Sequence, residues 1–316
     1  DEYVAAPNRA HTDLAAYNWV QILALTRGEH FYFGAYRPPE DYWPDTRGAG
    51  FEYNWAKVGS AASPATRLRI ARLFKMRASN RFMGSAYLAQ QTTGLLPYIQ
   101  DGKVDVVFIG AGSNDFFYHT NDFSVSGAFK PKKKVEISQD FIDAVAGSLI
   151  ASLDIVLQAG ADKAVLALVP MGTASADAGS EEVLRGIAAV NEVLAAAALE
   201  RSVAVVDLFG FTADSRRANA DGSVKIAGKV LAIDSAASAD DLLAAGAPGT
   251  GPCNSSGMCA APSHAEHYRA EDGLHPNTLV QGLIANQVMS ALNQQYGLQL
   301  ELLADDEILA LTSSRQ

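Results

Sequence analysis

The sequence predicts an α/β protein in which helices cover both faces of a central parallel sheet. Three short apolar segments of strand composition, 104–109, 164–169 and 203–208, alternate with long helical segments. Short apolar runs of this kind are typical of strands that are buried on both faces, as in parallel sheets. Strands that alternate with helices predict a three-layer α/β/α arrangement. No long linker and no internal repeat divides the 316 residues, so we expect one domain over 1–316.

The composition excludes several classes of protein. Hydrophobic residues make up 48% of the chain and charged residues 19%, which argues against a disordered protein. The formal net charge of -10 argues against a general nucleic-acid binder, because phosphate recognition needs clustered Lys and Arg. The one basic run, 130–134, is local and is predicted to be a solvated loop. No apolar stretch approaches the ~20 residues that a transmembrane helix needs.

The first helix is predicted to start with Thr12 or Asp13 as its N-cap and to end near Arg27. An irregular stretch rich in aromatic residues and proline follows over 30–50. This stretch either packs on the body of the protein or lines the substrate site, and both interpretations stay open. Further along, we expect a strand over 51–58, helices over 66–91, 138–158, 180–200 and 277–294, and an irregular region over 213–263.

The segment Gly110-Ala-Gly112-Ser-Asn114-Asp115 directly follows the predicted strand 104–109. It begins like a dinucleotide-binding fingerprint, but the third glycine is missing and no ordinary helix start is expected after it, so nucleotide binding is disfavoured. Glycine and asparagine also tolerate a positive φ, so a simple turn is one interpretation. The other is a functional loop, because in open parallel sheets ligands bind beyond the carboxyl ends of the strands.

A second motif, Asp272-Gly-Leu-His275-Pro276, precedes the last long helix. An Asp three residues before a His can hold its Nδ1 and leave Nε2 free to accept a proton. The alternative is an Asp-His pair on the surface that has no role in catalysis. If the functional interpretation holds, we expect this segment to converge with Asn114 at the same edge of the sheet.

Two further groups of residues bear on metals and on the compartment. His264 and His267, with His275, have the residue types of a zinc site, but no predicted helix fixes their geometry, so ordinary polar contacts are favoured. Cys253 and Cys259 lie in a Gly/Pro/Ser/Asn-rich segment, where a disulfide is favoured over a metal site. We therefore predict no metal and no cofactor, and an extracytoplasmic location.

The two motifs, in this order, resemble those of the SGNH (GDSL-type) hydrolases. Residues 112–115 match the third block of that family, whose asparagine is an oxyanion donor, here Asn114. Residues 272–276 match the fifth block, which contributes the catalytic Asp272 and His275. Residues 54–63 resemble the second block, whose glycine donates its backbone N–H to the oxyanion, here Gly59. The resemblance implies an SGNH-type (flavodoxin-like) fold and an esterase that needs no cofactor.

The first block of the family, Gly-Asp-Ser with the serine nucleophile, has no match in these residues. In the secreted bacterial branch that the chain resembles, segments like Asp1-Glu-Tyr3 and Asn18-Trp-Val20 follow that block. The resemblance thus implies a nucleophile and a first strand just upstream of Asp1, in a secreted bacterial protein.

We therefore expect an esterase or lipase-like serine hydrolase that acts on a small-molecule or polymer-borne ester. The alternative is a catalytically inactive SGNH-like protein that binds carbohydrate or acyl ligands in the same cleft.

Overall fold

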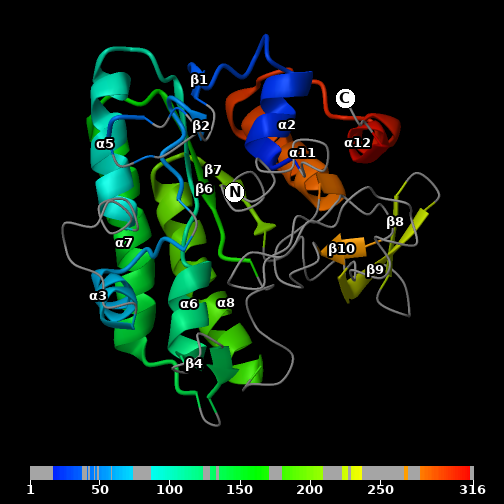
Figure 1. The fold of residues 1–316 in the computed structure, drawn as a ribbon. Helices are drawn as coiled ribbons and strands as arrows, with labels where there is room; N and C mark the ends of the chain where they lie inside the picture. Colours follow the sequence, from blue (N-terminus) through cyan, green and yellow to red (C-terminus); the bar gives the residue numbers. More distant parts are fainter. Residues whose placement is uncertain are drawn as a thin grey trace.

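A sheet of three parallel strands lies at the centre of the computed structural model (Figure 1). Its strands are β3 (Val106–Ile109), β6 (Lys163–Ala167) and β7 (Ala204–Val206), in the order β3-β6-β7. The predicted parallel strands are thus confirmed. The structure describes residues 17–37, 41, 43–45, 47, 50–57, 59–73, 87–123, 129–132, 135–170, 180–208, 223–226, 229–236, 267–269 and 278–313.

Helices cover both faces of this sheet, as the sequence predicts (Figure 1). Helices α5 (Leu88–Gln100), α7 (Gln139–Gln158) and α8 (Ser180–Glu200) form one layer. Helices α2 (Trp19–Thr26) and α11 (Thr278–Tyr296) form the other. Among the described residues, no helix combines the length and the apolar character that a membrane crossing requires.

The two layers are held by side chains that alternate along the strands. Val107, Ile109 and Leu166 pack into the core beneath α7 and α8. Their neighbours Phe108 and Val165 point to the opposite face and pack with α2 and α11. Because successive side chains of a strand point to opposite faces, each short apolar run supplies both cores. The sheet is therefore buried between the two helical layers.

Local sequence determines where the helices begin. Asn18 caps α2: its Oδ1 accepts the N–H of Gln21 at 2.9 Å, and Gln21 Oε1 accepts the N–H of Asn18 at 3.1 Å. The N-cap predicted at Thr12 or Asp13 lies outside the described residues, but the predicted end at Arg27 is confirmed. Ser138 caps α7 in the same way, so the predicted start of that helix is also confirmed.

The strand predicted over 51–58 is wrong. Strand β2 (Gly50–Phe51) pairs with β1 (Tyr36–Arg37) and then ends in a turn, in which the N–H of Asn54 binds the carbonyl of Phe51 at 3.1 Å. The Asn54 side chain also accepts the N–H of Ala56. Asparagine side chains compete in this way with strand pairing.

The single helix predicted over 66–91 is also wrong. The structure has α3 (Pro64–Leu73) and, separately, α5, which begins after Tyr87. Tyr87 is extended and forms a parallel bridge with Ala61, so the backbone is not helical at this point.

The region predicted to be irregular over 213–263 contains strands. Strands β8 (Ser223–Ile226) and β9 (Lys229–Ala236) form an antiparallel pair, and β10 (His267–Arg269) lies parallel to β9. Two residues, Ala227-Gly228, separate β8 from β9, and a short glycine-containing connection between strands predicts a hairpin. The remaining elements are α6 (Ser113–Thr120), β4 (Asn121–Phe123), β5 (Phe129–Pro131) and α12 (Asp305–Ser313).

The aromatic stretch 30–50 packs on itself and on its neighbours. Phe51 lies between the rings of Phe33 and Tyr36, with centroid distances of 5.7 and 5.1 Å. The guanidinium of Arg47 lies 4.3 Å from the ring centroid of Trp43 and 4.5 Å from that of Trp55. Of the two interpretations of this stretch, these contacts favour packing.

An extended segment after α11 is attached to that helix by two asparagines. Asn286 Nδ2 and Oδ1 bind the carbonyl and the N–H of Leu303, at 2.8 and 2.7 Å. Asn293 binds Leu300 in the same way, at 2.8 Å for both bonds. Each side-chain amide thus binds both backbone groups of one residue, as a neighbouring strand would. We call residues 300–303 the C-terminal strap.

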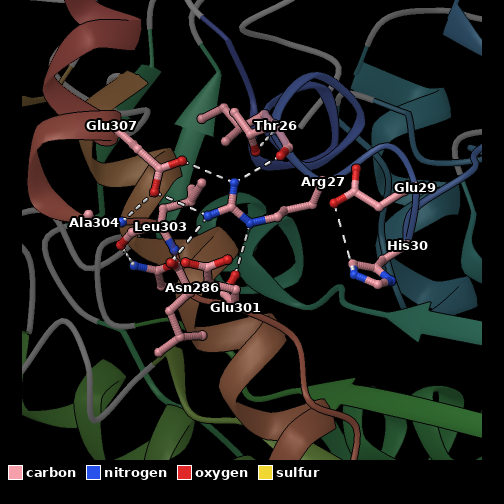
Figure 2. A network of polar contacts seen from close by, with 11 residues as sticks. Thr26, Arg27, Glu29, His30, Asn286, Glu301, Leu303, Ala304 and Glu307 are labelled. Carbon is pink, nitrogen blue, oxygen red and sulfur yellow. Dashed lines mark hydrogen bonds and ion pairs between the residues drawn. The ribbon is translucent and has the colours of Figure 1, made fainter.

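Arg27 attaches the strap to α2 and α12 (Figure 2). Its Nε and Nη2 donate to the carbonyls of Glu301 and Leu302 at 2.9 and 3.2 Å. Both oxygens of Glu307 accept from its Nη1 and Nη2, at 3.0 and 3.1 Å. Arg27 itself is only 8% exposed, so the loss of its side chain would leave several partly buried acceptors without this donor.

Replacing Arg27 by Met is expected to destabilise the protein by about 2 kcal/mol, mainly through the backbone carbonyls, because Glu307 is partly exposed. Arg185→Met is the matched control. Its side chain is 74% exposed and also pairs with a glutamate, so a loss below ~0.5 kcal/mol is expected. The hydrogen bond from Arg27 lowers the pKa of Glu307, so the ion-pair share of the effect disappears as pH falls through that lowered pKa. Urea unfolding at two pH values measures the loss of stability in each variant and the share that comes from the ion pair. Equal losses of stability in Arg27→Met and Arg185→Met would contradict this prediction.

Candidate active site

Asn114 lies in the first turn of α6, immediately beyond the carboxyl end of β3. Gly112 is the N-cap, with φ of 109°, a conformation that side chains rarely adopt. A Cβ at this position would also approach Cγ2 of Val169 to 2.7 Å. The sequence did not predict a helix start here, and this expectation was wrong: glycine lets the chain turn directly from the strand into α6.

The structure brings Asn114 to the predicted Gly59 segment. Asn114 Nδ2 donates to the carbonyl oxygen of Ser60 at 2.9 Å, across 54 residues of sequence. Gly59 has φ of 75° and lies in a turn, in which the N–H of Ser60 donates to the carbonyl of Lys57 at 3.2 Å. A primary amide has two N–H groups, so Asn114 retains one donor beyond the bond to Ser60. The Asn114 side chain is therefore hydrogen-bonded to the residue that directly follows Gly59.

Gln91, which the sequence did not indicate, holds this turn, and Asp115 holds the residues that follow it. Gln91 Nε2, from α5, donates to Ser60 Oγ at 2.8 Å, and that hydroxyl in turn donates to the carbonyl of Lys57. Asp115 is fully buried and accepts the N–H groups of Ala62 and Ser63. Burial raises the pKa of Asp115, and the hydrogen bonds from Ser63 and Ala62 oppose this rise.

Two histidine side chains lie in the described part of the chain, and no contact joins either of them to Asn114. The ring of His119 packs on Phe141 at 4.4 Å, and its Nε2 lies 2.8 Å from the carbonyl of Glu136. Burial lowers the pKa of His119. His30 is exposed, with Nε2 3.9 Å from Glu29. Neither of these two histidines is therefore assigned to the site.

The predicted pair Asp272 and His275 lies outside the described residues, as do Cys253, Cys259 and His264 and the side chain of His267. Within the described ranges, no group of three His, Cys, Asp or Glu side chains has the geometry of a metal site.

The chain just downstream of His275 is anchored beside β3. Buried Thr278 and Gln281, in the first turn of α11, accept the N–H groups of Tyr17 and Trp19 at 3.0 and 3.1 Å. The Trp19 ring in turn contacts Phe108 of β3, with a centroid distance of 4.6 Å. The start of α11 is thus fixed through α2 to the strand that precedes Asn114.

Comparison with known proteins identifies the family. The sequence profile of the GDSL-like Lipase/Acylhydrolase family matches residues 27–225, which include Gly59 and Asn114 but not Asp272 and His275. No curated protein matches the chain. Because the match covers well over half of the residues, and the three-layer α/β architecture agrees with it, the chain belongs to the GDSL-like lipase/acylhydrolase family.

Proposed function

We propose that this hydrolase cleaves carboxylic esters by a Ser-His-Asp mechanism, with Asn114 and the N–H of Gly59 as its oxyanion hole. The family assignment supports an ester-cleaving hydrolase. The observation that supports the finer proposal is the bond from Asn114 Nδ2 to the carbonyl of Ser60, the residue that follows Gly59. Donors directed at a developing oxyanion are commonly the largest single contribution to acyl-transfer catalysis.

The reaction would follow the usual order for acyl transfer. His275, oriented by Asp272, takes the proton of the serine as its oxygen attacks the ester carbonyl. The resulting oxyanion accepts hydrogen bonds from Asn114 and Gly59. The tetrahedral intermediate collapses, His275 protonates the leaving alcohol, and water then hydrolyses the acyl-enzyme by the same steps. No cofactor takes part in these reaction steps.

The nucleophile is proposed to lie on a segment upstream of Asp1, directly after a strand of the central sheet. The described sheet leaves a place for such a strand. β3 pairs with β6 along one edge and with no other described strand along its second edge. An edge of this kind can accept one more strand, so we propose that the strand before the nucleophile lies beside β3.

The substrate class is proposed to be a small-molecule or polymer-borne ester, and the location extracytoplasmic. The alternative is a protein of this family that lacks the serine and binds an acyl or carbohydrate ligand at the same site. The presence of the nucleophile therefore decides between the two functions.

A fluorophosphonate tests the proposal, because it phosphonylates activated serines. We expect the natural full-length protein to gain one adduct by intact-mass measurement and to lose its hydrolysis of p-nitrophenyl acetate in parallel. Peptide mapping should place the adduct on a serine upstream of Asp1. An unmodified protein that hydrolyses no ester would overturn the hydrolase proposal in favour of the binding protein.

A further inference from the structure

The carboxylate of Asp115 joins α6 to the segment that follows Gly59. Its Oδ2 accepts the N–H of Ala62 at 2.7 Å, and its Oδ1 accepts the N–H and the hydroxyl of Ser63 at 3.0 and 2.7 Å. The side chain is 0% exposed, and its partners lie more than 50 residues away in sequence. The role of this group is therefore to hold two distant segments of the backbone together.

The contacts favour the ionised form of Asp115. Each of its oxygens accepts a backbone N–H, and a backbone N–H can only donate. The carboxylate also lies at the start of α3, where Ser63 Oγ accepts the N–H of Thr66 at 3.3 Å. A helix N-terminus stabilises negative charge. Burying a carboxylate is costly, and here three donors and a helix end offset the cost.

Asn114 and Asp115 hold opposite ends of one short segment, residues 60–63. Asn114 binds the carbonyl of Ser60, and Asp115 binds the N–H groups of Ala62 and Ser63. Between them Ala61 is fully buried and bridges Tyr87. Since the two side chains are adjacent in one helical turn, the distance between the Asn114 amide and the Gly59 peptide depends on both.

We propose that Asp115 is the positioning residue of the oxyanion hole: it holds segment 60–63 so that the Gly59 N–H and the Asn114 amide face one point. This inference rests on the proposed function. Catalytic donors must be held within about 0.5 Å of the productive geometry, and a displacement of about 1 Å can cost 10²-fold in rate. Asp115 does not touch the substrate and acts only through Asn114 and Gly59.

Asp115→Asn removes one acceptor oxygen and places an NH₂ group against backbone donors. We expect kcat to fall by about 10- to 100-fold with KM changed less than about threefold, because the donors act on the transition state. Ser63→Ala keeps both N–H bonds and loses only the hydroxyl, so a loss in kcat of about threefold or less is expected. In an Asn114→Ala background, Asp115→Asn should cost less than it does alone, because one of its two targets is already gone.

Asn293→Ala is the control for lost stability, because it removes two partly buried hydrogen bonds to the C-terminal strap, away from the site. It should leave kcat unchanged. An Asp115→Asn protein with wild-type kcat, or with a loss that adds fully to that of Asn114→Ala, would overturn the positioning role.

Hydrogen exchange separates this inference from the proposed function. In Asp115→Asn, the amides of Ala62 and Ser63 should exchange at least tenfold faster than in Asn293→Ala. This result is expected even if the wild-type protein hydrolyses no ester, in which case only the proposed function fails. Unchanged exchange at both amides would overturn the inference whatever the activity.

Discussion

Replacing His275 by Ala is expected to lower kcat by about 10⁴- to 10⁶-fold while the protein remains folded. The proposed mechanism gives this side chain two proton transfers, from the nucleophile and to the leaving alcohol. Of the two histidine side chains that the structure describes, His119 binds Glu136 and His30 is exposed, so neither is expected to substitute for it. The measurement is steady-state ester hydrolysis, with the rate of fluorophosphonate labelling as a second readout.

His30→Ala is the matched control for His275→Ala. Its exposed ring lies 3.9 Å from Glu29, so kcat and KM should both stay at wild-type values. Asp272→Asn should lower kcat by about 10⁴-fold, since it changes the orientation and tautomer of the base. A His275→Ala protein that hydrolyses esters at more than a tenth of the wild-type rate would remove His275 from the mechanism.

The second large effect is expected at Asn114. Asn114→Ala should lower kcat by about 10²- to 10³-fold with little change in KM, because the amide donor serves the oxyanion and not the ground-state ester. The same substitution also removes the bond to the Ser60 carbonyl, so part of the loss comes from displacement of the neighbouring Gly59.

Asn121→Ala controls for that structural component. Asn121 follows the C-terminal end of the same helix, is buried, and donates its amide to the carbonyl of Phe117 at 2.9 Å. The two substitutions therefore delete comparable side-chain bonds from opposite ends of α6. We expect the control to lose stability and to keep kcat within about twofold. Comparable losses of kcat in the two variants would show that Asn114 matters only for the structure.

The central sheet was predictable because each of its strands has the apolar composition of a buried strand. Segments such as 164–169 are apolar at every position, which only a strand covered on both faces requires. The strand predicted over 51–58 failed for a local reason, since the side chain of Asn54 competes for the backbone. Strands β8 and β9 were missed because the region 213–263 is rich in Ala, Gly and Ser, which conceals the two-residue connection at Ala227-Gly228.

The candidate site was predictable only in part. Asn114 and Gly59 belong to segments that resemble family motifs, and the structure places their segments in contact. Asp115 lies in one of these segments, but its contacts could not be predicted, because the N–H groups that it accepts, at Ala62 and Ser63, are more than 50 residues away in sequence. Burial of a carboxylate depends on which distant N–H groups approach it, and no local pattern encodes that.

The C-terminal strap has a consequence for how the chain can vary in length. Asn286 and Asn293 are seven residues apart, which is almost two full turns of α11, so both face the same side and lie about 10 Å apart along the helix. Their partners Leu303 and Leu300 are three residues apart, and three extended residues also span about 10 Å. The two distances are equal, so the two amides fix the number of residues between Leu300 and Leu303. Inserting or deleting one residue between Leu300 and Leu303 would leave one asparagine without its backbone partner and would reverse the side chains beyond it. Residues 300–303 have no regular secondary structure, yet their length is as constrained as that of a paired strand.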